Sequence, residues 1–174
     1  MSEEQRHFKP LNIAVLTVSD SRSLAEDRSG DLLVERLEGV GHQLYERQLR
    51  PDDIYQIRAA VSQWIAAPEC DVVITTGGTG LTGRDGTPEA VSVLFDKTID
   101  GFGEMFRALS FQTIGSSTLQ SRATAGVANR TYLFVLPGST GACKDAWDNL
   151  IESQLDYRKR PCNLVELMPR LTER

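Results

Sequence analysis

Two aspartates, Asp52 and Asp85, are the side chains of this sequence best suited to catalysis. Each follows a stretch with the pattern of a β-strand, so each carboxylate is expected where a strand ends. Carboxylate oxygens are ligands that Mg²⁺ prefers, and such an ion would neutralise a neighbouring triphosphate. Two simpler roles stay open, because an aspartate at such a position can also cap a helix or stabilise a turn. Neither aspartate is expected to act as a covalent nucleophile.

A glycine-rich loop leads to Asp85. Five of the residues 77–86 are glycines, namely Gly77, Gly78, Gly80, Gly83 and Gly86. Glycine has no side chain, so such a loop can expose several backbone N–H groups at close range and bind a phosphate or another anion. The alternative is a long turn without a ligand. The number of glycines favours anion binding.

The glycine loop partly matches two known phosphate-binding motifs. Residues 78–83 have the G-x-G-x-x-G spacing of the dinucleotide fingerprint, but that motif needs a tight strand-to-helix turn. Here the next helix is expected only near Pro88, so we do not favour a dehydrogenase. The P-loop spacing is also present, but Arg84 and Asp85 stand where lysine and serine or threonine would contact phosphate and Mg²⁺. We therefore reject the P-loop.

The apolar pattern predicts the strands that would position these residues. Short runs rich in β-branched residues predict buried strands at 12–18, 71–76 and 131–136. Residues 42–49 alternate between polar and apolar and predict a half-exposed edge strand. Residues 113–128 fit no clear pattern.

Apolar stripes at helical spacing predict the intervening helices. One begins near Ser29 and is closed by Gly39 and Gly41, because glycine favours helix ends. The other predicted helices follow residues 51–53, begin with Thr87 as the N-cap and Pro88 as the first residue, cover 102–109, and run through 142–155.

Polar loops follow four predicted strands, at residues 19–21, 51–53, 77–86 and 137–139. Because strands alternate with helices, we expect an α/β fold with a parallel sheet, right-handed crossovers and helices on both faces. The carboxyl ends of parallel strands lie at one edge of the sheet, where ligands of such sheets bind. The four loops are therefore predicted to form one pocket.

Composition and charge exclude several classes of protein. A length of 174 residues fits one domain, and a net charge of −5 with interspersed signs argues against nucleic-acid binding. No run approaches the ~18 apolar residues that span a bilayer, and residues 1–10 lack the apolar region of a signal peptide. We expect a cytoplasmic protein with no nucleic-acid or membrane partner. Residues 1–10 are expected to form a flexible tail and residues 11–174 a single domain.

Cysteine and histidine suggest no second chemistry. Cys70, Cys143 and Cys162 are far apart and lack metal-binding spacing, so they are expected to be reduced thiols. His7 lies in the tail and His42 at a strand start, so no catalytic triad is indicated. Both histidines are expected to face solvent.

Several motifs in chain order resemble those of the MoaB/MogA family. The most specific is Thr75-Thr76-Gly77-Gly78-Thr79-Gly80, followed by Asp85 and Thr87-Pro88-Glu89. The other matching segments are residues 17–20, Asp27 with Gly30, Pro51-Asp52, residues 101–104 with Arg107 and Ser110, Ser121-Arg122, and residues 136–139. Together they span residues 12–155, and several ordered motifs are more specific than one. Residues 115–122 and 160–163 resemble the MoaB branch.

The resemblance implies a three-layer, doubly wound α/β molybdopterin-binding fold and a homotrimer or homohexamer. It also implies molybdenum cofactor biosynthesis, by transfer of AMP from Mg-ATP to the terminal phosphate of molybdopterin with release of pyrophosphate. Mg²⁺ is then the cofactor, ATP the co-substrate and molybdopterin the substrate. Other proteins of the same pathway are the implied partners. Asp52 and Asp85 would be catalytic and would hold Mg²⁺ directly or through water.

The residues that the resemblance implies for substrate or nucleotide binding come from the loops and from the segment after the glycine loop. They are Ser19, Asp20, Thr76, Gly77, Gly78, Thr79, Gly80, Ser110, Ser121, Arg122, Pro137, Gly138 and Ser139. Two alternatives stay open. A carrier or scaffold would bind molybdopterin without releasing pyrophosphate, and a nucleotide hydrolase of another pathway would consume ATP without a pterin.

Overall fold

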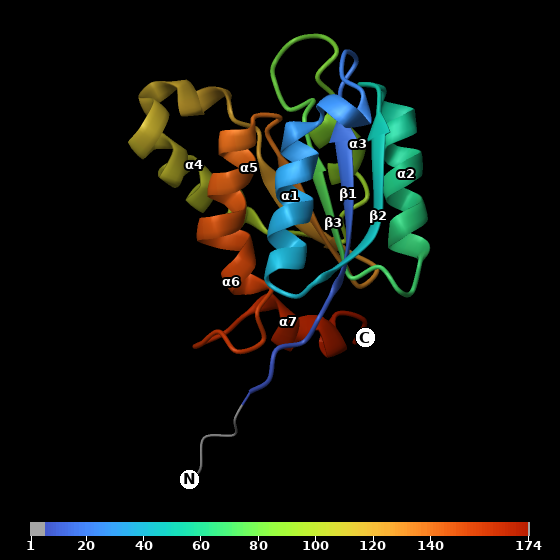
Figure 1. Cartoon of the computed structure of the whole chain (residues 1–174), viewed down its shortest axis with the longest axis vertical. Helices are drawn as coiled ribbons and strands as arrows, with labels where there is room; N and C mark the ends of the chain where they lie inside the picture. The colour runs from blue at the N-terminus through green and yellow to red at the C-terminus, as the bar shows by residue number, and fades with distance from the viewer. Residues whose placement is uncertain (1–5, 174) are drawn as a thin grey trace.

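The computed structural model describes residues 6–173, in which four neighbouring parallel strands form the larger part of one six-stranded sheet (Figure 1). The strands are β1 (Asn12–Val18), β2 (Gln43–Arg50), β3 (Val72–Thr76), β4 (Lys97–Thr98), β5 (Thr124–Ala128) and β6 (Thr131–Leu136). Their order across the sheet is β2-β1-β3-β6-β5-β4. The pairs β1–β2, β1–β3 and β3–β6 are parallel, whereas β5 is antiparallel to both β6 and β4. The prediction of a mostly parallel sheet is confirmed.

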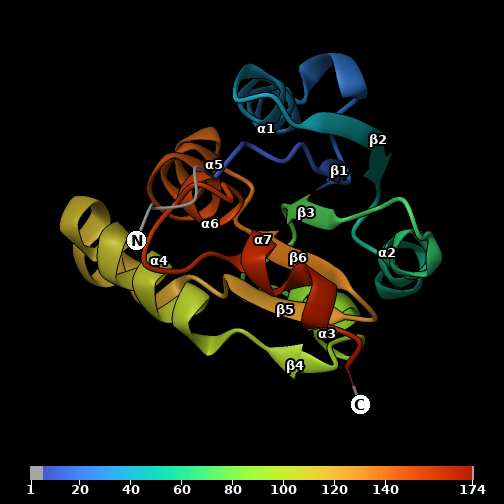
Figure 2. The same cartoon turned by 90° about the horizontal axis from the view of Figure 1, so that it is seen from below.

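Helices cover both faces of the sheet, as predicted (Figure 2). They are α1 (Arg28–Gly39), α2 (Ile54–Ala66), α3 (Thr87–Ser92), α4 (Asp100–Ile114), α5 (Thr140–Ala146), α6 (Glu152–Gln154) and α7 (Leu164–Leu167). The short 3-10 helices are Leu24–Glu26, Gly115–Gln120 and Met168–Arg170. Helices α1, α4, α5 and α6 lie on one face, and α2 and α3 lie on the other.

The two faces have separate cores because neighbouring strand residues point to opposite sides. Ile13 and Val15 of β1 are buried against α1 and α5, whereas Ala14 and Leu16 are buried against α2. Strands buried on both faces are continuous apolar runs, which is why β1, β3 and β6 could be predicted from sequence. Trp64 and Trp147, one in each core, are fully buried.

The predicted strands agree with the structure to within one residue. The strand predicted at 131–136 is β6 and the one at 12–18 is β1. The strand predicted at 71–76 begins one residue later as β3, and the one predicted at 42–49 is displaced by one residue at both ends as β2. Strands β4 and β5 were not predicted. The first has only two residues, and the second, TAGVA, contains glycine and alanine and therefore has a weak strand pattern.

Most helix predictions are confirmed, and three details differ. Helix α3 is capped by Gly86 rather than by Thr87, because Thr87 already lies in the helix. Helix α4 extends well beyond the predicted 102–109. The last predicted helix is interrupted by a π-helical turn at Trp147–Ile151.

The direction of the strand crossovers reverses between β1 and β3. The chain leaves β1 through α1 on one face to reach β2, and returns through α2 on the other face to reach β3. In doubly wound sheets ligands bind at the carboxyl ends of the strands beside such a reversal. In Figure 1 the loops after β1 and β3 rise together at this end, at the top of the view.

The N-terminal and C-terminal segments meet at the opposite end of the sheet. Residues 1–5 of the predicted flexible tail lie outside the described residues. Further along, Arg6 forms an ion pair of 2.7 Å with Glu166, and the Lys9 ammonium lies 3.6 Å from the centroid of the Tyr157 ring. Within the described part of the chain, no helix is both long and apolar enough to cross a membrane.

The expectation that His42 faces solvent is wrong. Its side chain is buried between Phe8 and Trp147, and Nδ1 accepts a hydrogen bond of 3.1 Å from the backbone N–H of Leu11. Burial lowers the pKa of His42 to about 4, and the nearby negative charge of Asp156 opposes that shift only in part. The sequence pattern did not show that the residue before the strand turns inward.

Candidate functional site

The loops at the carboxyl edge are joined by direct hydrogen bonds. The backbone N–H of Ser19 donates to the carbonyl of Arg50 at 2.9 Å, which ties the loop after β1 to the end of β2. The N–H of Gly77 donates to the carbonyl of Leu136 at 3.1 Å, which ties the glycine loop to the end of β6. These two bonds hold segments that are far apart in the sequence next to one another at this edge.

Asp52 is not the helix cap that was its alternative role. The neighbouring Asp53 caps α2, accepting hydrogen bonds from the N–H groups of Tyr55 and Gln56 at 3.0 and 2.9 Å. The Asp52 carboxylate instead accepts a bond of 3.2 Å from the N–H of Gly86 in the glycine loop. Asp52 is thus directed across the edge toward the glycine loop.

Asp85 does have the turn role that was considered for it. Its backbone N–H bonds the carbonyl of Thr82 at 3.0 Å, and its Oδ2 accepts from the N–H of Thr82 at 3.0 Å and from the Thr82 hydroxyl. A Cβ at Gly80 would lie 2.6 Å from the same oxygen. The carboxylate therefore stabilises the loop that carries it, and one oxygen is engaged in that task.

A third aspartate, Asp20, links two other loops. Its Oδ1 accepts the backbone N–H of Asp52 at 2.9 Å, and its carboxylate forms a two-bond ion pair with Arg84 at 2.7 and 2.8 Å. Both side chains are partly exposed, Arg84 by 67% and Asp20 by 43%. Arg84 was not predicted as a site residue, although its position beside Asp85 was a usable signal.

The three carboxylates differ in their electrostatic surroundings. Burial raises the pKa of Asp52, and the negative charges of Asp85 and Asp20 add to this effect. Hydrogen bonds from Thr82 lower the pKa of Asp85, and the Arg84 guanidinium lowers that of Asp20. A group of close negative charges is stabilised by a bound cation. We call Asp20, Asp52 and Asp85 the acidic half of the edge.

Arg122, implied to bind substrate, supports the glycine loop in this structure. Its guanidinium donates to the carbonyls of Thr79, Gly80 and Asp85 at 3.1, 2.7 and 3.2 Å, and it pairs with Glu89. Each of its nitrogens is engaged with protein. The structure therefore places Arg122 behind the loop as its anchor.

The loop after β6 is held from both sides. The Thr76 hydroxyl donates to the carbonyl of Pro137 at 2.9 Å, and the Ser29 hydroxyl donates to that of Gly138 at 2.8 Å. Ser139 caps α5 by accepting the N–H of Ala142 at 3.1 Å. A Cβ on Gly138 would lie 3.1 Å from the Cα of Gly77, so the two loops touch backbone to backbone. Gly77 and Gly138 form a ridge along the edge.

Two of the implied binding residues lie apart from these contacts. Ser110 is buried on α4, and no hydrogen bond in the described residues links its side chain to the edge loops. Ser121 precedes β5, and its hydroxyl is buried with no hydrogen-bond partner in the described part of the chain. Thr76 is the last residue of β3 and Arg122 precedes β5, whereas the remaining implied residues lie in the loops at the edge.

The sequence pattern did not predict the buried ion pair between Asp27 and Arg47, which lies beneath the edge. Asp27 caps α1 by accepting the N–H of Gly30 at 2.9 Å, and its other oxygen bonds the Thr17 hydroxyl at 2.6 Å and Arg47 at 2.9 Å. Burial alone would raise the pKa of Asp27, but these hydrogen bonds outweigh it and the pKa is lowered. Ser29 lies two residues after Asp27, in the first turn of α1, so the cap also helps to position the Ser29–Gly138 bond.

The acidic half fits Mg²⁺ as a partial ligand set. Its donors are all carboxylate oxygens, which suit that ion. In residues 6–173 no three His, Cys, Asp or Glu side chains are grouped so as to hold a metal by themselves. Mg²⁺ at Asp52 and Asp85 would therefore need water or phosphate oxygens, as is usual for this ion in phosphate chemistry.

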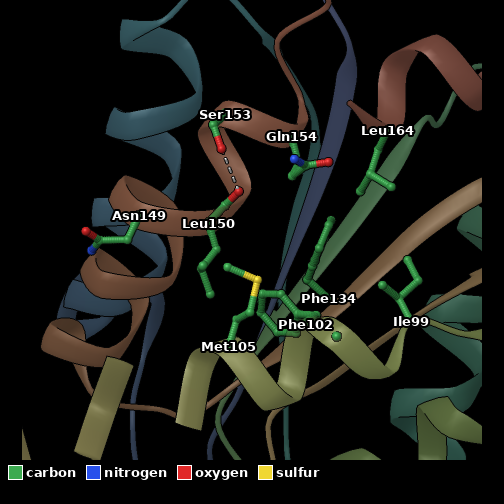
Figure 3. Close-up of a pocket in the computed structure, with 10 residues that line it drawn as sticks. Ile99, Phe102, Met105, Phe134, Asn149, Leu150, Ser153, Gln154 and Leu164 are labelled. Carbon is green, nitrogen blue, oxygen red and sulfur yellow. Dashed lines mark hydrogen bonds between the residues drawn. The ribbon is translucent and has the colours of Figure 1, made fainter. Parts of the chain in front are cut away.

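A separate cavity of about 240 Å³ lies between α4 and the α5–α6 helix (Figure 3). Its lining is mainly apolar, with Phe102, Met105, Phe134, Leu150 and Leu164 facing the space. No titratable side chain lines it. Acid–base or metal chemistry is therefore expected at the carboxyl edge and not here.

Residues 14–157 match the model of a family described as "Probable molybdopterin binding domain". The chain belongs to the MoaB/MogA family. Molybdenum cofactor biosynthesis protein B of Escherichia coli (strain K12) is 52% identical over 163 residues, covering 94% of this chain and 96% of the relative. The protein of the same name from Bacillus cereus is 43% identical over 150 residues, covering 86% of this chain and 89% of the relative.

Solved structures of the MoaB/MogA family have the same fold. A crystal structure of Molybdenum cofactor biosynthesis protein B, at 43% identity, superposes with a TM-score of 0.83 over 86% of this chain and 94% of that one. A MogA structure at 30% identity has a TM-score of 0.72 over 83% of this chain and 97% of that one. The predicted MogA/MoaB-like fold is confirmed, and the chain belongs to a family with members named for molybdenum cofactor biosynthesis.

Proposed function

We propose that this protein acts in molybdenum cofactor biosynthesis and transfers AMP from Mg-ATP to the terminal phosphate of molybdopterin. The observation that supports this most directly is that the carboxylates of Asp52, from the end of β2, and of Asp85, within the loop, both lie against glycines of the loop. A Cβ at Gly78 would lie 2.8 Å from Asp52 Oδ2, and one at Gly80 would lie 2.6 Å from Asp85 Oδ2. Two carboxylates thus lie against backbone that can approach phosphate closely.

The proposed step makes one phosphorus–oxygen bond and breaks another. An oxygen of the molybdopterin phosphate attacks the α-phosphorus of ATP, and the bond from that phosphorus to the bridging oxygen breaks. Pyrophosphate leaves with the electron pair of that bond. Such transfers depend mainly on positioning and on stabilisation of charge.

The chain's own residues would position the reactants. Asp52 and Asp85 would hold Mg²⁺, which supplies neutralisation of phosphate charge when bound. Backbone N–H groups of the glycine loop would contact phosphate oxygens. Arg122 would keep the loop in shape, because its guanidinium binds three of the loop's carbonyls.

The test is pyrophosphate release by the purified protein with ATP, Mg²⁺ and molybdopterin. Release should require the pterin and should fall by about a hundredfold or more in Asp85→Asn, as for loss of a group that stabilises transition-state charge. The amide oxygen of asparagine can still accept the Thr82 bonds, so the loop should keep its shape. Asp53→Asn is the matched control, because asparagine also caps helices and Asp53 faces α2.

A carrier or scaffold role is the second candidate, and the turn role of Asp85 favours it. Because one Asp85 oxygen already bonds Thr82, this carboxylate has a structural reason to be present without catalysis. Molybdopterin binding by the wild type without any pyrophosphate release would support the carrier and contradict the transferase. ATP consumption in the absence of the pterin would contradict both.

A further inference from the structure

The carboxyl edge has a second half whose charge is opposite to that of the acidic half. On the α1–α5 side of the sheet lies a cavity of about 690 Å³. Its lining residues are Ser21, Arg22, Ala25, Glu26, Arg28, Ser139 and Thr140. We call this space the basic cavity. The cavity lies at the start of α1 and α5, which cover one face of the sheet, whereas Asp52 precedes α2, which covers the other face.

The two arginines of the basic cavity are not neutralised by protein. Among the ion pairs of the described chain, residues 6–173, none joins the Arg22 or the Arg28 guanidinium to a carboxylate. Glu26 lines the cavity, but its carboxylate accepts the N–H and the hydroxyl of Ser23 at 3.1 and 2.9 Å. Asp27 is buried below and paired with Arg47. Both arginines thus keep their donors available.

Hydroxyl groups line the cavity beside the arginines. Ser139 Oγ accepts the N–H of Ala142, so its own proton is free to be donated. Thr140 Oγ1 lies 3.5 Å from Ser29 Oγ, and Ser29 in turn bonds Gly138. Two guanidinium groups with adjacent hydroxyls match the charge and the several acceptor oxygens of a phosphate group.

We infer that the basic cavity binds a phosphate group of a substrate, with Arg22 and Arg28 as its ligands. The source of that phosphate, the pterin or the nucleotide, rests on the proposed function, whereas phosphate binding itself does not. Neither Asp52 nor Asp85 lines the basic cavity, so a phosphate held there is bound by groups other than these two carboxylates.

The first experiment measures binding of inorganic pyrophosphate by calorimetry at low salt, with EDTA present so that the acidic half holds no metal. The double variant Arg22→Gln/Arg28→Gln should bind at least tenfold more weakly than the wild type. The matched control is Lys97→Gln/Lys159→Gln, which removes the same charge from exposed residues outside the cavity. The control should bind like the wild type.

Repeating the titration with ATP and with molybdopterin identifies the source. Selective loss of molybdopterin affinity in the arginine variant assigns the cavity to the pterin phosphate, and selective loss of ATP affinity assigns it to the nucleotide. Equal pyrophosphate affinity in the wild type and the variant, or no binding by the wild type, would overturn the inference. Loss of affinity in the variant, with no pyrophosphate release by the wild type, would remove the proposed function and leave the cavity assignment standing.

A second measurement uses only the wild type, in case the double variant does not fold. Phenylglyoxal modifies accessible arginines, and the modified positions can be located by mass spectrometry. Pyrophosphate should slow modification of Arg22 and Arg28 and leave the exposed Arg160 unchanged. Equal rates at Arg22 and Arg28 with and without pyrophosphate would contradict the proposal.

Discussion

At the scale of a single residue, the protonation state of Asp52 depends on burial and on the charges of its neighbours. Burial and the charges of Asp85 and Asp20 raise the pKa of Asp52, so it takes up a proton at a higher pH than an ordinary aspartate. Only the ionised form is a good Mg²⁺ ligand. Pyrophosphate release should therefore decline as the pH falls through this raised pKa.

The decline of pyrophosphate release at low pH is the acid limb of the pH profile. The variant Asp20→Asn should shift this acid limb to lower pH. It removes one negative charge near Asp52 and frees the Arg84 guanidinium, and both changes favour the ionised form. The measurement is the pH profile of kcat/KM, with Asp53→Asn as the control that leaves the limb in place. An acid limb that stays put or moves to higher pH in Asp20→Asn would refute the assignment to Asp52.

The buried ion pair of Asp27 is a second prediction at the residue scale. Asp27→Asn keeps an acceptor for the helix cap but leaves Arg47 without its buried partner. The free energy of unfolding should therefore fall by about 3–5 kcal/mol. Asp31→Asn is the control. It removes a carboxylate 2.7 Å from the same guanidinium, but that side chain is 60% exposed, so the loss should be below about 1 kcal/mol. Urea denaturation measures the free energy of unfolding of both variants. Similar losses of stability in Asp27→Asn and Asp31→Asn would contradict the prediction.

At the scale of the element, the glycine loop depends on where its glycines lie. Gly78 has a φ of +65°, and a Cβ there would lie 2.3 Å from Thr87 Oγ1. Gly83 has no such strain, and a Cβ there would meet nothing within 4 Å. Gly78→Ala should therefore displace Asp52 or the start of α3 and reduce pyrophosphate release at least tenfold.

Gly83→Ala is the control for that loop and should retain near wild-type release and stability. Both variants replace one glycine of the same loop by alanine, so they differ mainly in φ and in the space at the substituted Cα. Thermal unfolding of both separates a local effect on the site from loss of the fold. Equal activities in the two variants would show that the loop's shape does not matter.

At the scale of the whole molecule, His42 links stability to pH. Its pKa falls from the usual 6.5 to about 4 on folding, so the unfolded chain binds a proton that the folded chain does not bind between these values. The stabilisation is fully present above pH 6.5 and is lost as the pH falls toward 4. Its size is on the order of 3 kcal/mol.

The variant His42→Asn tests this, because its amide oxygen can replace Nδ1 as the acceptor for Leu11. It should be less stable than the wild type at pH 7, and it should lose less stability than the wild type between pH 7 and pH 5. His7→Asn, at an exposed position, should keep the wild-type dependence. A His42→Asn protein with an unchanged dependence would disprove the role of this histidine.

Some features of the molecule could be predicted from sequence because they depend on local pattern. Continuous apolar runs predicted β1, β3 and β6, and their alternation with helices predicted the parallel sheet. Parallel strands bring their carboxyl ends to one edge, so the position of these loops at one edge of the sheet followed from the topology. The short β4 and the glycine-containing β5 have too weak a pattern to be predicted in this way.

Which side chain does what at the edge depends on contacts between distant segments, and only the tertiary structure decided this. The sequence left open whether Asp52 caps a helix, and the structure shows that Asp53 has that role. Arg122 binds carbonyls more than 30 residues away, and His42 is buried by Phe8 and Trp147. Composition and spacing carry local preferences, whereas the burial and pairing of a polar group depend on which neighbours the fold brings to it.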